Sequence, residues 1–230
     1  EEMTDSISHR GPDDYGYFND DDVRLGFRRL SIIDIDYGHQ PMQSIEGRYV
    51  VVFNGEIYNF KKIKSFLESK KYEFITSCDT EVILYAYDYW REKCVNEFNG
   101  MFAFAIYDKV DKSVFLARDR LGIKPLYYTK IDNTIIFSSE IKAILKYPQF
   151  KKVADLKSIS SYLTFRYTYG DRTFFEGIKK LMPGHTMLLK NETHSINCYW
   201  SIPYHNYKDN LGENYYLNKV KDLLDESVSR

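Results

Sequence analysis

The chain has 230 residues, which is enough for one sizeable domain or two small ones. Its 32 Lys and Arg residues nearly balance 33 Asp and Glu residues, so the formal net charge of -1 favours neither nucleic acid nor an anionic membrane as partner. No apolar run approaches the roughly 20 residues that span a bilayer, and no signal peptide is evident. The three cysteines, Cys78, Cys94 and Cys198, match no metal or disulfide spacing. We therefore expect a cytoplasmic protein with no metal site and with buried, structural thiols.

Short strand patterns recur between residues 23 and 138. They cover residues 23–28, 48–53, 101–107, 113–118, 126–129 and 134–138. The run MFAFAIY alternates large and small apolar residues, which is typical of a strand buried on both faces between packed layers. Turn residues such as Asp132 and Asn133 separate the later runs and predict the hairpins of an antiparallel meander.

Helical patterns interrupt these strands. Phe60, Ile63 and Leu67 share one helical face, with Asn59 as the expected N-cap. Further helices are expected over residues 79–93, 139–146 and 155–164. Strands that form sheets, with helices grouped between them, indicate a layered α+β domain.

The end of the chain has a different character. After Pro203 the sequence becomes polar, and then Leu217, Val220, Leu224 and Val228 recur at helical spacing. This amphipathic helix is either the start of another domain or a helix docked on the same core. The pattern alone leaves both interpretations open.

The stretch YVVVFNGEIYNF, residues 49–60, contains the strongest candidate for a chemical site. Asn-Gly between two apolar runs predicts a tight hairpin turn, and from this dipeptide alone the turn is favoured. The alternative is an oxyanion hole, because the side-chain amide of Asn54 and the backbone N–H of Gly55 could both donate to one oxygen. Glycine would also allow a substrate to approach the backbone closely.

Other charged residues have both structural and functional interpretations. Glu56 in a strand is either exposed to solvent or paired with a cation, and Arg29 could bind a carboxylate with both of its guanidinium arms. Asp79 is expected to be a helix N-cap, although it could instead face a substrate ammonium group. The segments HRGPDD (9–14) and ARDRLGIKPLYY (117–128) are interpreted as structural turns, the second with an Arg118–Asp119 pair.

Taken together and in order, several segments resemble glutamine-hydrolysing asparagine synthetases. They are HRGPDD, FRRLSIIDID, FNGEIYNF, SCDTEVIL, FNGMFAFAIYD, ARDRLGIKPLYY and FSSEIKAIL. The resemblance covers the class II glutamine amidotransferase domain of these enzymes, from His9 to about Trp200. It implies the fold of the N-terminal nucleophile hydrolases, a four-layer αββα sandwich of two antiparallel sheets flanked by helices.

The resemblance also implies roles at the reacting end of a glutamine site. Asn54 and Gly55 would form the oxyanion hole, and Glu56 and Asp79 would hold the α-ammonium group. A zwitterionic amino acid needs carboxylates at its ammonium end and hydrogen-bond donors at the reacting amide, so these residue types fit.

At the other end of the substrate, the resemblance implies that Arg29 grips the α-carboxylate of glutamine. The backbone of Leu30, Ile32 and Ile33 would line the same pocket. No cofactor is expected in this domain, whose partners would be glutamine and a synthetase domain of the same protein.

The nucleophile of this family is an N-terminal Cys whose own α-amino group acts as general base, the logic seen for Thr with an N-terminal amine. It lies a strand and a helix upstream of HRGPD, whereas this chain opens with EEMTDSIS, which is typical of the last turns of a helix. We therefore expect residues 1–205 to be an amidotransferase domain without its first residues, which alone would not hydrolyse glutamine. Residues 206–230 would be a linker and the first helix of an absent ATP-dependent synthetase domain, which would bind ATP and magnesium.

The leading hypothesis is the glutaminase half of an asparagine synthetase, which hydrolyses glutamine to glutamate and ammonia for the ATP-dependent amidation of aspartate. One alternative is a homologue that amidates another carboxylate, such as a polysaccharide uronic acid. Another is a non-catalytic module for glutamine binding or assembly. The oligomeric state, with a homodimer as one option, is left open by the sequence.

Overall fold

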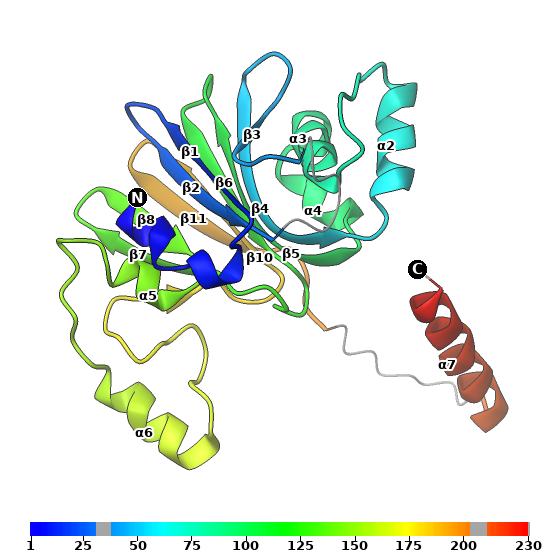
Figure 1. Cartoon of the computed structure of the whole chain (residues 1–230). Coiled ribbons are helices and arrows are strands. Elements are labelled where there is room, and N and C mark those ends of the chain that lie inside the picture. The colour runs from blue at the N-terminus through cyan, green and yellow to red at the C-terminus, as the bar shows by residue number, and fades with distance from the viewer. Residues whose placement is uncertain (31–37, 203–210, 230) are drawn as a thin grey trace. The chain divides into compact units, whose positions relative to one another are not determined.

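A computed structural model of the chain describes residues 1–30, 38–202 and 211–229 (Figure 1). The chain divides into two units, Glu1–Trp200 and Ser201–Arg230, which are described separately. The described residues of the second unit form helix α7 (Glu213–Val228), as the apolar spacing predicts. Within the described ranges, no helix has both the length and the apolar character needed to cross a membrane.

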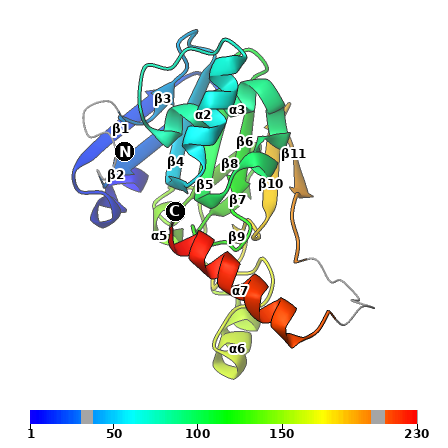
Figure 2. The same cartoon turned by 90° about the vertical axis from the view of Figure 1, so that its right-hand side faces the viewer.

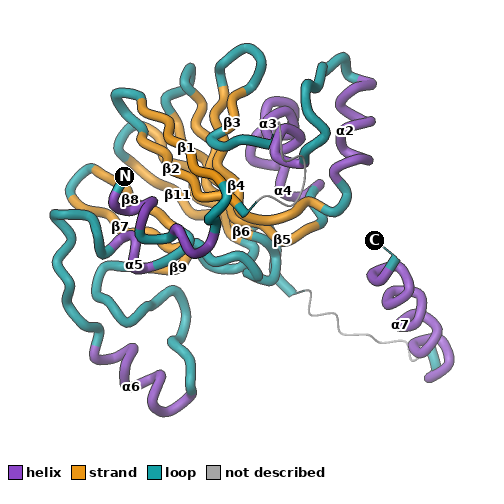
Figure 3. Tube along the Cα trace, viewed as in Figure 1, coloured by secondary structure: helices purple, strands orange, loops and turns teal. Residues whose placement is uncertain are grey.

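In the first unit, groups of consecutive strands are separated along the chain by groups of helices (Figure 3). The α-helices are α1 (Glu2–Asp5), α2 (Phe60–Ser69), α3 (Asp79–Trp90), α4 (Cys94–Glu97), α5 (Ile141–Ile144) and α6 (Leu156–Phe165). The 3-10 helices are η1 (Ser8–Arg10) and η2 (Arg91–Lys93). The strands are β1 (Asp14–Asn19), β2 (Arg24–Arg29), β3 (Met42–Gln43), β4 (Tyr49–Ile57), β5 (Gly100–Asp108), β6 (Ser113–Arg118), β7 (Tyr127–Ile131), β8 (Thr134–Ser138), β9 (Lys179–Lys180), β10 (His185–Lys190) and β11 (Thr193–Cys198).

The largest sheet has six strands in the order β11-β10-β6-β5-β4-β3, and each neighbouring pair is antiparallel. Its two central strands carry side chains that alternate between two cores. In β5, Phe104 and Ile106 belong to the core on the helical side, whereas Ala103 and Ala105 belong to the core on the other side. This confirms that MFAFAIY is a strand buried on both faces, as its large and small residues predict.

Helices α2 and α3 cover one face of the large sheet (Figure 2). In α2, Ile63 and Leu67 are buried on the predicted face. The side chain of Asn59 occupies the N-cap position but makes no capping bond. It instead accepts from the N–H of Asn99 at 2.9 Å and donates to the carbonyl of Glu97 at 2.9 Å, which ties α2 to the start of β5.

The second layer lies against the opposite face of the large sheet and consists of two small antiparallel sheets. One is β1-β2 and the other is β8-β7-β9. Leu25 of β2 and Tyr128 of β7 share a core with Val50 and Ala105 of the large sheet, and Ile144 of α5 packs on Ile136 of β8 from outside. The order of layers is therefore helices, large sheet, second layer, helices, which confirms the predicted αββα arrangement (Figure 1).

The structure also contains strands that the sequence patterns miss. β1 falls in and after the HRGPDD segment, and β10 and β11 form a hairpin at the edge of the large sheet. Every residue of β11 is exposed, so its sequence lacks the alternation that identifies a half-buried strand.

The ARDRLGIKPLYY segment is a structural turn, but its charges are used differently from the prediction. Arg118 donates to the carbonyls of Lys124 (2.7 Å), Leu181 (2.7 Å) and Gly122 (2.8 Å) rather than pairing with Asp119. Asp119 is 1 % exposed, and its carboxylate accepts backbone N–H groups of the turn and of β5. The segment therefore anchors β5 next to the strand that carries the candidate site.

Candidate functional site

The Asn54–Gly55 pair lies inside β4, so the predicted hairpin turn is wrong. Strand β4 continues through both residues, with Asn54 opposite Ala103 and Gly55 opposite Phe102 in β5. Local turn preference is outweighed because the apolar sequence on both sides of the pair forms one nine-residue strand that is held by β5. The dipeptide therefore has a use other than reversing the chain.

Glycine is needed at position 55 because β5 lies very close. A Cβ atom there would be 2.1 Å from the carbonyl oxygen of Met101 and 2.8 Å from the Cα atom of Phe102. Its φ of +155° is also one that residues with a side chain rarely adopt. Any larger residue would push β4 away from β5 at the position of the candidate oxyanion hole.

The direction of the Gly55 N–H follows from its neighbours. Backbone N–H groups of a strand point alternately to its two edges. The N–H of Phe53 donates to Oε1 of Gln40 at 2.6 Å, and the N–H of Ile57 donates to Oδ2 of Asp79 at 2.9 Å, both on the edge away from β5. The N–H of Gly55, midway between them, points to this same outer edge.

The side chain of Asn54 supplies a second donor beside this N–H. Asn54 is on the same face of β4 as Val50 and Val52, which pack toward the second layer. Its Nδ2 atom is buried, and among the buried side-chain nitrogen and oxygen atoms of the described residues it is the one that has no hydrogen-bond partner. Leaving a buried amide unpaired costs about 1–3 kcal/mol, so this group is suited to a ligand. An unpartnered side-chain N–H beside a backbone N–H that points to the outer edge of β4 fits an oxyanion hole.

Arg29 ends β2 and is 7 % exposed although it is charged. The HRGPDD turn positions its backbone closely. A Cβ atom at Gly11 would lie 2.4 Å from the backbone nitrogen of Arg29, and the N–H of Asp13 donates to the carbonyl of Arg29 at 3.1 Å. The turn is therefore structural, as predicted, but what it holds in place is a candidate substrate-binding residue.

Of the predicted site residues that follow Arg29, the structure describes only one. Leu30 is described and is 55 % exposed, which places it at the surface next to Arg29. Ile32 and Ile33 lie outside the described residues. The predicted lining of the pocket by the backbone of these three residues therefore stays a prediction.

Asp79 and Glu56 form the acidic part of the site. Asp79 is the first residue of α3 and Cys78 is its N-cap, so the predicted N-cap role of Asp79 is wrong by one position. Its carboxylate is 6 % exposed and instead accepts from the N–H of Ile57. Burial raises the pKa of Asp79, and the nearby charge of Glu56 raises it further, against the opposing effect of the backbone hydrogen bonds.

These residues share one large cavity, which we call the inter-sheet trough. Its volume is about 2130 Å³, and its lining includes Arg29, Leu30, Asn54, Gly55, Glu56 and Asp79. The trough is also lined by the whole of β8 and of β2, and each of these strands is the outermost of its sheet within the described ranges. The structure therefore brings together six of the predicted site residues beside two strand edges that no other described strand pairs.

The cysteines differ from one another in accessibility. Cys78 and Cys94 are buried, and burial raises the pKa of both thiols, so they are structural as predicted. Cys78 is in the lining of the trough, but its sulfur is hydrogen-bonded to the hydroxyl of Thr76 at 3.0 Å, which is not a base. Cys198 is exposed at the end of β11, so the prediction of a buried thiol is wrong there.

Sequence reasoning overlooked Gln40, which is 9 % exposed and lies in the lining of the trough. Its side chain binds the backbone of β4 directly before Asn54. No local pattern marks it, because a Gln before a proline is usually an exposed turn residue.

The sequence and the fold of the chain both match known proteins. Residues 1–200 match the family model described as a glutamine amidotransferase domain. The chain is 36% identical to a Bacillus subtilis protein named asparagine synthetase [glutamine-hydrolyzing] 3, over 99% of this chain and 37% of the relative. It is 37% identical to asparagine synthetase [glutamine-hydrolyzing] 1 of the same organism, over 99% of this chain and 36% of the relative. The chain thus spans a little over a third of the length of these relatives.

A solved structure shows the same fold. It is a glutamine phosphoribosylpyrophosphate amidotransferase from B. subtilis, complexed with ADP and GMP, which matches with a TM-score of 0.54 and 19% identity. The match covers 78% of this chain and 35% of that protein. At this identity the likeness supports the fold, that of the N-terminal nucleophile hydrolases, and leaves the chemistry to the site residues.

Proposed function

The chain belongs to the glutamine amidotransferase domain family, homologous to the glutaminase part of asparagine synthetases, and from this premise we propose that its trough binds and hydrolyses glutamine. The observation that carries the proposal is the buried, unpartnered Nδ2 of Asn54 beside the outward-pointing N–H of Gly55. These are the donors that a tetrahedral intermediate of amide hydrolysis requires, and they lie in a site that also holds charges of both signs.

The charged residues suit the two ends of a free amino acid. Arg29 would bind the α-carboxylate, because a guanidinium group matches a carboxylate with two parallel hydrogen bonds. Asp79 and Glu56 would bind the α-ammonium group, and one oxygen of Asp79 is already fixed by the N–H of Ile57. This arrangement would leave the side-chain amide of glutamine at the Asn54–Gly55 donors.

We further propose that the nucleophile is the thiol of an N-terminal cysteine in a segment that precedes Glu1 in the full-length protein. The support is the position of the trough between the edges of β2 and β8 that no other described strand pairs, where an extended segment could lie. Such a segment would complete the hydrogen bonding of both edges. It would also place a residue of its own next to Asn54, Gly55 and Asp79.

In the proposed reaction the α-amino group of that cysteine takes the thiol proton, and the sulfur attacks the side-chain carbonyl carbon of glutamine. The carbonyl oxygen becomes an oxyanion, which accepts hydrogen bonds from Asn54 Nδ2 and Gly55 N–H. The C–N bond then breaks, the leaving nitrogen takes the proton, and ammonia departs. Water attacks the resulting thioester, which releases glutamate and restores the thiol.

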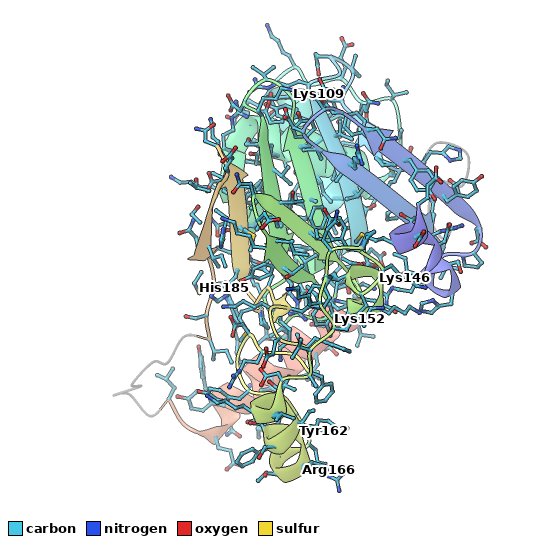
Figure 4. All side chains as sticks on the ribbon, turned by 90° about the vertical axis from the view of Figure 1, so that its left-hand side faces the viewer. Lys109, Lys146, Lys152, Tyr162, Arg166 and His185 are labelled. Atoms are coloured by element: carbon cyan, nitrogen blue, oxygen red, sulfur yellow. The ribbon has the colours of Figure 1, made fainter. Side chains whose placement is uncertain are left out.

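The ammonia is proposed to be used by an ATP-dependent synthetase domain that accounts for much of the additional length of the relatives, with ATP and magnesium bound there. Two apolar surfaces support such a partner, one on α6 of the first unit and one on α7 of the second unit. On α6 the side chains of Leu156, Leu163 and Phe165 are exposed, and Figure 4 shows Tyr162 and Arg166 of this helix at the end of the first unit opposite Lys109. On α7 the apolar residues Leu217, Val220, Leu224 and Val228 recur at helical spacing and form one apolar face. We propose aspartate as the acceptor, as the names of the relatives suggest.

The test of glutamine hydrolysis is glutamate release by the full-length protein with its native N-terminus. The assay should be done in a Cys198→Ser background, because Cys198 is the exposed thiol of the described chain, whereas Cys78 and Cys94 are buried. We expect turnover of glutamine that is abolished by brief treatment with iodoacetamide, and no turnover by residues 1–230 alone. Full-length protein that binds glutamine without turnover would instead indicate a non-catalytic glutamine-binding module.

Replacing Arg29 by alanine should raise the KM for glutamine about 10- to 150-fold, which corresponds to the loss of about 1.5–3 kcal/mol for hydrogen bonds to a charged group. The kcat should change much less, because the α-carboxylate is bound equally in the ground state and the transition state. Arg28→Ala is the matched control, since the guanidinium of Arg28 is engaged by Asp5 and lies over the ring of Tyr15. Equal KM values for both variants would refute the role of Arg29.

The raised pKa of Asp79 predicts how binding depends on pH. The ammonium group of glutamine is bound by the carboxylate form, so the KM should rise as the pH falls through the raised pKa. The acid limb of a plot of log(kcat/KM) against pH should therefore begin at a higher pH than an ordinary Asp would give. In Asp79→Asn this limb should shift or vanish, with a higher KM at neutral pH; a profile identical to that of the wild-type protein would contradict the assignment.

Folding stability should show the opposite dependence at the same residue. Because the pKa of Asp79 is higher in the folded than in the unfolded chain, folding binds a proton there. The contribution of this group to stability is thus fully present below its unfolded pKa and is lost as the pH rises through its folded pKa. The ionised form that binds substrate is the form that costs stability.

A further inference from the structure

Beyond the end of β3, side chains instead of a neighbouring strand bind the backbone N–H groups at the outer edge of β4. Strand β3 consists of Met42 and Gln43, which pair with Val51 and Val50. Beyond Val51 three N–H groups point to this edge, those of residues 53, 55 and 57. The first donates to Gln40 and the third to Asp79, so the two flanking groups are satisfied by side chains while the central one, on Gly55, faces the trough.

The side chain of Gln40 makes two bonds that join separate elements. Its Oε1 accepts from the N–H of Phe53 at 2.6 Å, and its Nε2 donates to Oγ1 of Thr80 at 3.3 Å. Thr80 is 4 % exposed and follows Asp79 in the first turn of α3. Gln40 therefore links the strand that carries the oxyanion donors to the helix that carries the acidic end of the site.

We propose that Gln40 is a positioning residue for the oxyanion hole, an inference that rests on the proposed glutaminase function. By holding the N–H of Phe53, it fixes the peptide plane between Val52 and Phe53, two planes before the one that carries the Gly55 N–H, and so limits how far that N–H can turn. Asp79 fixes the same strand two residues further on through Ile57. The strand is therefore held on both sides of Gly55 by buried side chains, Gln40 before it and Asp79 after it.

The chemistry of the site explains why such an anchor matters. Hydrogen bonds to an oxyanion accelerate a reaction only when their donors are already aimed at the position where charge develops. β3 no longer supports β4 at this point, and Gly55 has no side chain that could pack to hold it. A shift of a few tenths of an ångström would weaken the bonds to the transition state while leaving the charged ends of the glutamine pocket in place.

The test uses kcat and KM for glutamine hydrolysis by the full-length protein. Gln40→Met keeps the shape of the side chain and removes both hydrogen bonds, whereas Gln40→Glu keeps an acceptor for the N–H of Phe53. The matched control is Ser44→Ala. Oγ of Ser44 accepts from the N–H of Tyr49 at 3.2 Å on the same edge of β4, but Tyr49 is at the start of the strand, away from Gly55. Ser44 is also buried, at 4 % exposed.

We expect Gln40→Met to lower kcat about ten-fold or more with a change in KM of less than about three-fold, and Gln40→Glu to recover much of the loss. An aldehyde analogue of glutamine, which forms a tetrahedral adduct with the thiol, should inhibit Gln40→Met more weakly by a similar factor, while inhibition by glutamate stays unchanged. Ser44→Ala should keep the wild-type kcat even if its melting temperature falls as much as that of Gln40→Met.

Three results would overturn the inference. They are wild-type kcat in Gln40→Met, an equal loss of kcat in Ser44→Ala, or a parallel weakening of glutamate and aldehyde binding, which would indicate general disruption of the pocket. If Gln40→Met does not fold, Thr80→Val, which removes the partner of Gln40 Nε2, takes its place. Its kcat should then be lower than that of Gln40→Glu and of Ser44→Ala, and equal kcat values for the three variants would overturn the inference. A wild-type full-length protein without glutaminase activity would refute the proposed function itself, and this inference with it.

Discussion

Replacing Asn54 by alanine is expected to lower the kcat for glutamine hydrolysis by the full-length protein about 10²- to 10³-fold. This is the usual cost of removing one donor from an oxyanion hole. The KM should change little, since Nδ2 of Asn54 has no hydrogen-bond partner among the described residues and is needed mainly when charge develops on the substrate carbonyl. Steady-state measurement of glutamate release gives both constants.

The control for this variant is Asn59→Ala. Asn59 lies in the same segment, but both ends of its amide group bind backbone atoms of residues 97 and 99. Removing these bonds should reduce stability and leave kcat near the wild-type value. In contrast, Asn54→Ala breaks no hydrogen bond of the side-chain amide nitrogen and should leave stability unchanged or raise it. A kcat for Asn54→Ala within about three-fold of wild type would contradict the role of Asn54.

Replacing Gly55 by alanine is expected to damage both structure and activity. The new Cβ would lie 2.1 Å from the Met101 carbonyl, which is a backbone atom and cannot rotate away. Forcing an extra carbon into a tightly packed position typically costs about 1–3 kcal/mol, and the unfavourable φ adds to this. The pairing of β4 with β5 should open locally, and hydrolysis should fall with it.

Hydrogen–deuterium exchange of the full-length protein measures this effect on the relevant strands without interference from other domains. Amides of β4 and β5 should exchange faster in Gly55→Ala, by a factor that reports the lost free energy of opening. Gly170→Ala is the control, because Gly170 also has a positive φ (+61°), but no atom of the described residues lies within 4 Å of the position that a Cβ would occupy. Equal protection of β4 in the two variants would show that the close approach of β5 is not the cause.

The strands of the large sheet could be predicted largely because their side chains obey simple rules. Strand β6, like β8 of the second layer, has the predicted bounds, and β5 extends its prediction by one residue at each end. Buried apolar runs of this kind need no information from distant parts of the chain. The exposed β11 could not be found in this way, because it is held by pairing with β10 and carries no apolar pattern of its own.

The Asn54–Gly55 pair shows the limit of local reasoning. A dipeptide that favours a turn is kept in a strand by a partner about 50 residues away in sequence, and no window around position 54 contains this information. The same limit applies to Gln40, whose role depends on contacts with β4 and α3. The resemblance to asparagine synthetases implied the six site residues that the trough brings together, whereas the residues that hold them in place became evident only in three dimensions.

The central claim is that the Asn54–Gly55 donors serve a covalent reaction of glutamine with a thiol outside residues 1–230. It is tested most directly by treating the full-length protein with a diazoketone analogue of glutamine, which alkylates the nucleophile that attacks the carbonyl, and mapping the adduct by mass spectrometry. We predict one adduct per chain, on a cysteine that precedes Glu1, and protection by excess glutamine. An adduct on Cys78, or no glutamine-protected adduct at all, would contradict the account.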